Sequence, residues 1–206
     1  MVDNVSNAVI KSIDKKFSQI EQKVTHLQDE LAAVKKSIDN MVKRSKDDAS
    51  KLIQQNGILE KKLDNIDQDR RKKNLRVFNV KEKDKENTRE EILALLRTKL
   101  AINLSTNDIV ICYRVGKQEE GRKPRGIFLK LKDFNMKQEI YRKKKLLKGT
   151  GVVIREDLTH HRIELLAHAV EKTSLQSVWT DKGIIYVNID NKISIIKSRE
   201  EFDKLF

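Results

Sequence analysis

The chain of 206 residues is 36% charged and only 5% aromatic, which excludes one large hydrophobic core and indicates one or two domains with much exposed helix. Its formal net charge of +13 favours a polyanionic partner. The excess lies in residues 67–206, with 32 basic and 21 acidic residues, rather than in residues 1–66, with 12 and 10. The single cysteine, the lack of a signal-peptide pattern and the lack of an 18-residue apolar run lead us to expect a soluble intracellular protein without disulfides or membrane spans.

An apolar stripe with alternating spacings of three and four residues begins at Ile10 and runs through the first 66 residues. A repeat of 3.5 residues keeps such a stripe facing a partner helix, so the spacing predicts a parallel coiled coil over residues 1–68. The alternative is an amphipathic helix that folds back on its own domain, but that helix would have a broader apolar face. The positions expected to mediate oligomerisation are Ile13, Phe17, Ile20, Val24, Leu27, Leu31, Val34, Ile38, Met41, Leu52, Asn56, Leu59 and Leu63.

The repeat is interrupted once, where polar Ser45 and Asp48 occupy expected core positions, and it resumes with an offset of four residues. Such a stutter locally unwinds a supercoil. Asn56 then occupies an a position, where asparagine fixes register and strand number at a cost in stability. Ile13 and Ile20 at d positions favour a homotrimer, whereas a leucine at another d position also allows a dimer. A homotrimer is expected, and both states remain open.

Residues 69–157 alternate between strand and helix patterns. In chain order they are a strand over Leu75–Val80, a helix opened by a capping box at Thr88–Glu91, a β-rich run over Asp108–Gly116, a strand over Gly126–Lys132, a helix over Phe134–Leu147 and a strand over Val152–Arg155. This βαββαβ order is the ferredoxin-like split unit, and the length suits an atypical RNA-recognition motif (RRM) domain of about 80 residues.

The alternation within the first and third strands predicts the side chains on the exposed face of the sheet, while the apolar residues between them enter the core. About one aromatic residue per strand is then available to stack on a base, at about 1–3 kcal/mol each. The alternative is that both phenylalanines belong to the core. The residues expected on the exposed face are Arg76, Phe78, Phe128, Lys130 and Lys132.

The segment Arg114–Lys148 holds 13 basic and four acidic residues. The loop before the third strand and the end of the second helix border the same sheet in this topology, so their cations are expected to bind phosphates. The alternative is an ordinary solvated charged face. The basic residues expected to contact nucleic acid are Arg114, Arg122, Lys123, Arg125, Arg142, Lys143, Lys144 and Lys145, with Arg155 and Arg162 beyond the segment.

Residues 158–206 predict a small α/β C-terminal domain that leans on the middle domain and binds nucleic acid, with a cleft between the two as a natural path for a single strand. The expected elements are a helix over Thr159–Thr173, strands over Gln176–Thr180, Ile184–Ile189 and Lys192–Lys197, a tight turn at Asp190–Asn191, and a final helix capped at Ser198–Glu201 that carries Phe202, Leu205 and Phe206. The side chains expected to pack from the first helix are Ile163, Leu166, Ala167 and Val170.

Five sequence pieces and their order carry a family resemblance: "RRKKNLRVFNV", "ICYRVGK", "RKPRGIFLKLK", "VIREDLT" and "DNKI". With the preceding coil, they make the chain resemble the RNA-binding protein encoded by the first open reading frame of LINE-class (non-LTR) retrotransposons. The resemblance implies a homotrimer, sequence-tolerant binding of single-stranded RNA with single-stranded DNA as an alternative, and nucleic-acid chaperone activity in retrotransposition. It also implies a cytoplasmic ribonucleoprotein particle, with access to the nucleus as a second expectation.

The resemblance assigns the family's basic loop to Arg122, Lys123 and Arg125 and its basic helix end to Arg142–Lys145. The coil is shorter than in the mammalian members. The family's RNA-contacting arginine in the C-terminal helix falls on apolar residues here, and Arg162 lies nearby in a different register. The family also has an aromatic residue in its C-terminal domain, and the candidates for that residue in this sequence are Trp179 and Tyr186.

No catalytic pattern is found in the sequence. His160, His161 and His168 cluster in one predicted helix, but without a Cys-x-x-Cys or His-Glu-x-x-His spacing, so no metal site is expected. A Gly-rich phosphate loop and a Gly-x-Ser-x-Gly elbow are also missing from the sequence. We therefore expect no enzyme and no cofactor. The alternative function is a coiled-coil scaffold whose basic heads bind acidic protein partners.

Overall fold

The computed structural model describes residues 2–117, 123–174 and 177–205, with side chains from residue 11 onward. Arg122, Gln176 and Phe206, which the sequence analysis assigned to a basic loop, a strand and a helix, lie outside these residues. The chain divides into two compact units, Met1–Glu60 and Lys61–Phe206. The first is helical and the second combines helices with two antiparallel sheets, so the predicted α+β class is confirmed.

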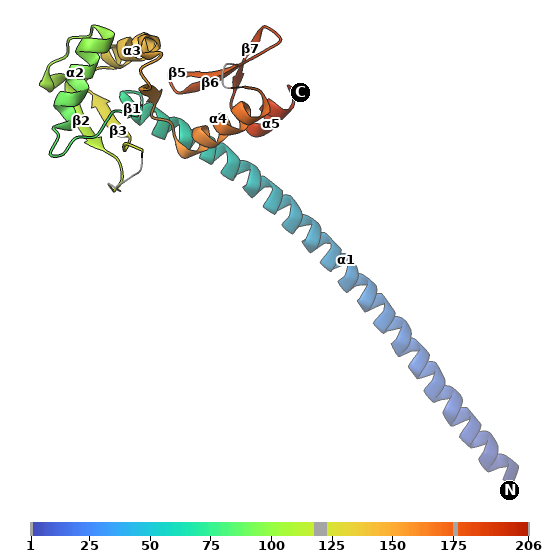
Figure 1. Ribbon diagram of the computed structural model, residues 1–206. Coiled ribbons are helices and arrows are strands. Elements are labelled where there is room, and N and C mark those ends of the chain that lie inside the picture. Colours follow the sequence, from blue (N-terminus) through green and yellow to red (C-terminus); the bar gives the residue numbers. More distant parts are fainter. Residues whose placement is uncertain (1, 118–122, 175–176, 206) are drawn as a thin grey trace. The chain divides into compact units, whose positions relative to one another are not determined.

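Helix α1 (Val2–Arg70) is one continuous helix of 69 residues (Figure 1). Its sequence has no proline and one glycine, Gly57, so nothing in it stops helix propagation. The predicted seam is exposed along the single chain, with Phe17 63% and Leu31 69% exposed. A long apolar stripe on a helix is stable in water when a partner covers it. The helix is therefore suited to self-association, which stays a prediction.

The first sheet has the strand order β2-β3-β1-β4, with every neighbouring pair antiparallel. Helices α2 (Thr88–Leu100) and α3 (Phe134–Lys143) supply its core partners (Figure 1). The predicted order of strand, helix, strand, strand, helix, strand is the order in the structure. The four strands are β1 (Asn74–Phe78), β2 (Ile109–Arg114), β3 (Ile127–Leu131) and β4 (Val153–Glu156).

Several element ends differ from the predictions. Strand β1 stops before Asn79, whose φ of 61° breaks the extended backbone. The N-cap of α2 is Asn87, whose side chain accepts a hydrogen bond from a backbone N–H of the first turn, so the cap lies one residue before the predicted Thr88. Helix α3 gives way to a 3₁₀ turn over Lys144–Leu147, and another 3₁₀ turn over Thr106–Asp108 precedes β2.

The second sheet has the order β5-β6-β7, built from β5 (Val178–Asp181), β6 (Ile184–Ile189) and β7 (Lys192–Ile196). The core against one face of this sheet comes from α4 (His160–Lys172) and α5 (Arg199–Asp203). Between β6 and β7, Asp190 and Asn191 both have positive φ, of 50° and 64°, as a two-residue hairpin turn requires.

The buried face of α4 differs from the prediction. Leu165 and Ala169 are buried, whereas the predicted core residue Ile163 is 52% exposed and Ala167 is also exposed. Leu166, which was predicted correctly, packs against the same core from its edge. Positions four apart on a helix lie on one side, so the helix turns the Leu165–Ala169 side toward the small sheet and leaves the Ile163–Ala167 side in water.

Candidate nucleic-acid interface

The face of the first sheet opposite to its core carries the aromatic and basic side chains of β1 and β3. Leu75 and Val77 of β1, and Ile127, Leu129 and Leu131 of β3, are fully buried against the helices. The side chains that alternate with them therefore project from the other face, because successive residues of a strand point to opposite sides. The structure places Arg76, Phe78, Phe128 and Lys130 on this face, half-buried, with Lys132 exposed at the end of β3.

A row of four side chains crosses this face. Tyr113 in β2 pairs with Phe128 in β3, Phe128 pairs with Arg76 in β1, and Arg76 pairs with Arg155 in β4. The ring centres of Tyr113 and Phe128 are 5.3 Å apart, and the guanidinium carbon of Arg76 lies 5.0 Å from the Phe128 ring centre. Flat aromatic and guanidinium groups offer stacking surfaces for bases. The Nε of Arg76 donates to Asp157 at 2.7 Å, so the exposed Arg155 is the cation of this row that is open to a phosphate.

Tyr113 was not among the predicted site residues, although it is 49% exposed. It lies two residues after Ile111, which is exposed on the same strand. The alternation in "ICYRV" was the available signal, because it places Tyr113 on the side opposite to Cys112. On the same face, the exposed Arg155 lies with its guanidinium carbon 5.7 Å from the ring centre of Phe78.

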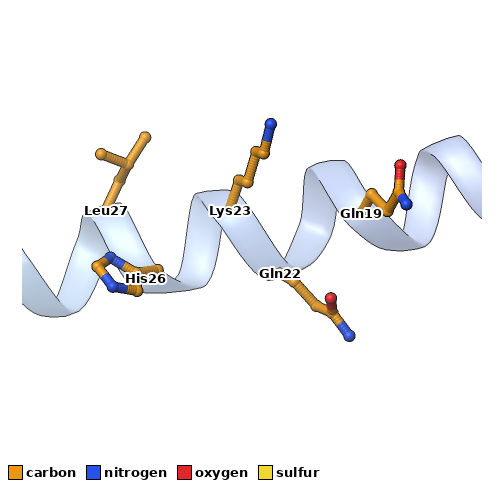
Figure 2. A pocket seen from close by; sticks show the side chains of 5 residues that line it. All are labelled: Gln19, Gln22, Lys23, His26 and Leu27. Atoms are coloured by element: carbon orange, nitrogen blue, oxygen red, sulfur yellow. The ribbon is translucent and has the colours of Figure 1, made fainter.

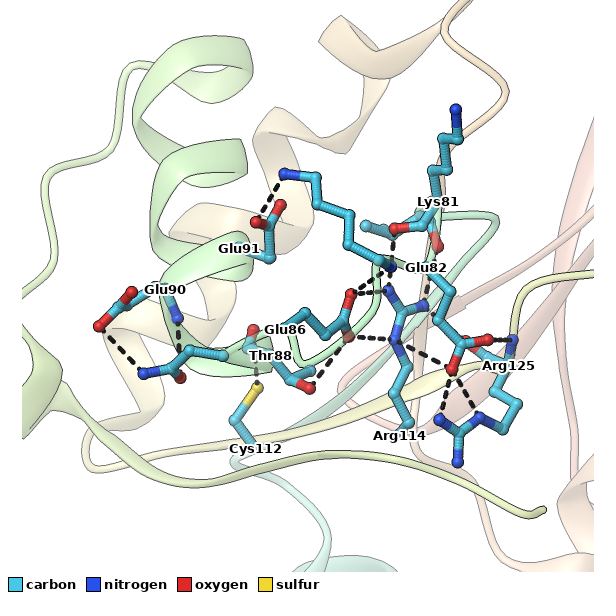
Figure 3. Close-up of polar contacts among 12 residues, drawn as sticks. Lys81, Glu82, Glu86, Thr88, Glu90, Glu91, Cys112, Arg114 and Arg125 are labelled. Atoms are coloured by element: carbon cyan, nitrogen blue, oxygen red, sulfur yellow. Dashed lines mark hydrogen bonds and ion pairs between the residues drawn. The ribbon is translucent and has the colours of Figure 1, made fainter. Parts of the chain in front are cut away.

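Arg114 takes a structural role in place of the predicted contact with nucleic acid. Its side chain is only 4% exposed, and its Nε donates to Glu86 Oε1 at 2.8 Å. Its Nη1 donates to the backbone carbonyls of Val80 and Arg125 at 2.8 and 2.9 Å (Figure 3). A guanidinium whose donors are used internally is not available to a phosphate. Arg114 therefore ties the loop after β1 to the end of the β2–β3 loop.

Arg125, at the end of the predicted basic loop, is partly engaged in the same network. Its Nε donates to Glu82 Oε1 at 2.6 Å (Figure 3). Its Nη1 donates to the carbonyl of Gly116 at 2.9 Å. The hydrogen bond from Arg125 lowers the pKa of Glu82, and the hydrogen bond from Arg114 lowers the pKa of Glu86. Of the three predicted basic residues of this loop, Lys123 is exposed to water and Arg122 lies outside the described residues.

The basic end of α3 also contains cations in unlike surroundings. Arg142 and Lys145 are exposed, whereas Lys143 forms an ion pair with Glu139 at 2.9 Å. The ammonium of Lys144 lies 3.5 Å from the ring centre of Tyr141, and burial lowers its pKa. Arg142 and Lys145 are therefore the two residues of this cluster best exposed to a phosphate.

Arg162 is placed inside the second unit. Its guanidinium donates to Asp64 Oδ2 at 2.8 Å, to Asn65 Oδ1 at 2.7 Å and to the carbonyl of Gly183 at 2.9 Å. Burial raises the pKa of Asp64, but the hydrogen bonds from Thr159 and Arg162 outweigh burial and lower it. The predicted nucleic-acid contact at Arg162 is therefore replaced by an internal ion pair.

A second aromatic pair lies on the small sheet. Trp179 in β5 and Tyr186 in β6 are register partners, with ring centres 5.7 Å apart and an angle of 9° between the ring planes. Tyr186 also pairs with Ile195 of β7, which is exposed together with Trp179. The neighbours that alternate with them, such as Val187, are buried against α4 and α5. The sequence had named Trp179 and Tyr186 as candidates, and the structure brings them together.

The next feature is the histidine cluster of α4, His160, His161 and His168. Within the described ranges, no group of three or more His, Cys, Asp or Glu residues is arranged to hold a metal ion. His160 lies 3.2 Å from Glu164, and His168 lies 2.8 Å from Asp203. The thiol of Cys112 lies 3.7 Å from the carbonyl of Thr88, and burial raises its pKa to about 11.

A shallow depression on α1 is lined by Gln19, Gln22, Lys23, His26 and Leu27. Figure 2 shows these five side chains projecting from successive turns of one helix. Leu27 belongs to the predicted seam, and the other four are polar. The depression is therefore the surface of a single exposed helix rather than an enclosed ligand site.

Comparison of the chain with models of known protein families and with curated proteins gives no match. Among the described residues, no helix combines the length and the apolar character needed to cross a bilayer.

Proposed function

We propose that this protein binds single-stranded RNA through the exposed face of its first sheet and self-associates through α1. The observation that carries the proposal is the row Tyr113, Phe128, Arg76 and Arg155, which spans all four strands. Proteins that bind single strands without strong sequence preference combine aromatic stacking surfaces with cations along the backbone path. In this proposal the first sheet and its helices act as an RRM-like domain.

The cations proposed to hold the RNA backbone are those that the structure leaves exposed. Lys123 lies in the loop before β3, Lys132 follows β3, and Arg142 and Lys145 lie at the end of α3. Each is free of the internal ion pairs that engage Arg114 and Arg162. Phosphate attraction of this kind is insensitive to sequence and weakens with salt.

The aromatic pair Trp179 and Tyr186 is proposed as a second stacking surface on the small sheet. Its near-parallel rings leave the outer face of the pair for a base, and Ile195 extends the exposed row. A strand that reached both sheets would gain from two modest interactions on one chain. Single-stranded DNA offers the same bases and phosphates and is the alternative ligand.

Self-association through α1 would multiply these modest contacts. The exposed seam is proposed to assemble as a parallel homotrimer. The two sheets of each copy could then hold the same flexible RNA strand. Once one copy is bound, the others bind at a high effective concentration rather than at their bulk concentration. An oligomer of this kind suits a nucleic-acid chaperone that coats a transcript in a ribonucleoprotein particle, in the cytoplasm and with access to the nucleus. This is the activity of the LINE-class proteins that the sequence resembles.

The test is a titration of the full chain with a labelled single-stranded RNA at low and physiological salt. Tyr113→Ala is expected to weaken binding by about 1–3 kcal/mol, the value of one base stacked on an aromatic ring, while Tyr113→Phe retains it. Ile163→Ala, an exposed apolar truncation on α4, is the matched control and should leave affinity unchanged. Weak binding of the unaltered chain at physiological salt would overturn the proposal and favour a scaffold for acidic proteins.

A further inference from the structure

The last turns of α1 contact the segment that joins the two sheets. Gln68 is buried, and its amide donates to the carbonyl of Asp157 at 3.1 Å while accepting from the backbone N–H of Thr159 at 3.0 Å. Arg71, just past the helix end, donates to the carbonyl of Leu158 at 3.3 Å. Three consecutive residues, Asp157–Thr159, are thus held by side chains from the end of one helix.

The side chain of Asp157 connects this segment to the first sheet. Its Oδ1 accepts from Arg76 Nε at 2.7 Å, and its Oδ2 accepts from Asn74 at 3.0 Å. Asp157 is almost completely buried, and Arg71 lies 3.5 Å from it as a second cation. A buried carboxylate surrounded by donors resists displacement, because moving it would leave buried polar groups without partners.

The turn between β5 and β6 approaches the same helix end from the other side. Gly183, with φ of 78°, lies so close to Gln68 that a Cβ atom at Gly183 would be 2.8 Å from the Gln68 side chain. The N–H of Gly183 donates to Glu156 Oε2 at 3.0 Å, and its carbonyl accepts from Arg162. The tip of the second sheet is therefore in contact with α1, with β4 and with α4.

We propose that the end of α1 from Asp64, together with Arg71 just after it, is a brace that fixes the C-terminal sheet against the first sheet, and that Arg162 is a positioning residue within it. The side chain of Arg162 joins Asp64 and Asn65 of the helix to Gly183 of the turn. Asp64 also accepts a hydrogen bond from the hydroxyl of Thr159, the N-cap of α4. The brace sets the separation of the two aromatic surfaces.

The brace and the seam use different sides of the same turns. Leu63 and Ile66 are seam residues and are 66% and 58% exposed, whereas Asp64 and Gln68 point into the contacts described above. The contacts of Asp64 and Gln68 pack one side of these turns, whereas the seam on the other side is exposed in the single chain and open to a partner helix. Assembly of the coil and ordering of the C-terminal sheet are therefore expected to reinforce each other.

Hydrogen exchange of the full chain without RNA tests the brace directly. The amides of Thr159 and Gly183 report on it, because both donate across the junction. Asp64→Ala and Arg162→Ala are expected to speed exchange at both amides by about tenfold or more, with amides of β1 and β3 unchanged. Glu171→Ala, an exposed acidic residue of α4, is the matched control. Unchanged exchange in Asp64→Ala would overturn the brace.

Two milder variants test whether the geometry of the Arg162 side chain, and not only its charge, is required, and they are less prone to misfold than Arg162→Ala. Arg162→Lys keeps the positive charge but loses the planar fork that reaches three acceptors, so its exchange should resemble that of Arg162→Ala. Asn65→Ala removes one exposed partner of Arg162 and should give a smaller change in the same direction. If Arg162→Lys exchanges as the unaltered chain does, a fixed geometry is not required and the positioning role is wrong.

A measurement of RNA affinity, which rests on the proposed function, distinguishes the two possible roles of Arg162, because they predict opposite changes in affinity. Were Arg162 a phosphate contact, Asp64→Ala would release its guanidinium and tighten RNA binding more than Glu171→Ala does. If Arg162 is a positioning residue, Asp64→Ala should bind RNA about threefold or more weakly than the unaltered chain, although the variant has lost a negative charge. If the unaltered chain binds no RNA, the proposed function fails while the exchange measurements still decide the brace.

Discussion

The ammonium group of Lys137 in α3 forms an ion pair with the carboxylate of Glu156 in β4, and the two side chains are only 1% and 3% exposed. The second oxygen of Glu156 accepts from the backbone N–H of Gly183, and the ammonium lies 4.9 Å from the ring centre of Tyr141. Desolvation of two charges is expensive, so the pair is stable only because each charge has its partners in place.

Removal of one member of this pair should be costly. Lys137→Met leaves the carboxylate of Glu156 buried with one remaining donor, and we expect a loss of about 3–5 kcal/mol in the free energy of unfolding. The double variant Lys137→Met/Glu156→Gln keeps an acceptor for Gly183 and should recover most of that loss. Urea unfolding of both variants measures the difference. Equal destabilisation by the two variants would contradict the account.

The contact between Glu86 and Arg114 predicts a pH dependence of stability. The hydrogen bond from Arg114 lowers the pKa of Glu86 from its ordinary value of 4.5 in the folded chain. The contribution of Glu86 is therefore complete above about pH 4.5 and is lost as the pH falls through the lowered pKa. Glu86→Gln should be less stable than the unaltered chain at pH 7, and the difference should shrink below pH 4.5.

Thermal unfolding over a series of pH values checks this prediction. Glu171→Gln, which alters an exposed glutamate of α4, is the control and should differ little from the unaltered chain at any pH. A stability difference for Glu86→Gln that stays constant down to the acid limit would mean that Arg114 does not stabilise the ionised carboxylate.

The exposed cations predict how RNA binding depends on salt. Lys123→Ala and Lys145→Ala should each weaken binding to all sequences alike and reduce the slope of log affinity against log salt by about 0.7. Lys36→Ala and Lys43→Ala, at positions of α1 outside the seam that face away from a partner helix, should leave the slope unchanged. Slopes measured by anisotropy titration at several salt concentrations distinguish the two sets, and equal effects of the two sets would refute the assignment.

The seam predicts a link between assembly and affinity. Leu27→Asp together with Leu31→Asp places charges at adjacent core positions and should yield monomers in sedimentation equilibrium. RNA affinity should then fall about 100-fold or more, because the advantage of several heads on one strand is lost. Gln22→Asp introduces the same charge on the outer side of the helix and should keep both the oligomer and the affinity. Monomers that bind as tightly as the unaltered chain would rule out this role for the coil.

Periodicity accounts for what could be predicted. The alternation of Leu75 with Arg76, and of Leu129 with Phe128, fixed both the strands and the faces on which these residues lie. Local capping signals placed the starts of the helices to within a residue, with Asn87 preceding the predicted Thr88, whereas α3 ends at Lys143 and not at the predicted Leu147. These features depend on neighbours in the sequence, which a single chain displays directly.

Whether an individual basic side chain is ion-paired inside the protein or exposed to water could not be predicted in this way. Arg114 meets Glu86 across 28 residues and Arg162 meets Asp64 across 98, so no local pattern marks either arginine as internal. A count of basic residues treats them like Lys123, which faces water. The pairing of Tyr113 with Phe128 depended likewise on strand register, although the alternation within β2 could have placed Tyr113 on the exposed face.

The state of Cys112 has a practical consequence for fluorescent labelling. With a pKa of about 11, roughly one thiol in ten thousand is ionised at neutral pH, and the thiolate is the form that reacts with maleimide dyes. A second cysteine placed at an exposed position, such as Lys172 of α4, would therefore be modified far faster than the native thiol. Dyes attached there would report distances between copies of the chain in the proposed oligomer.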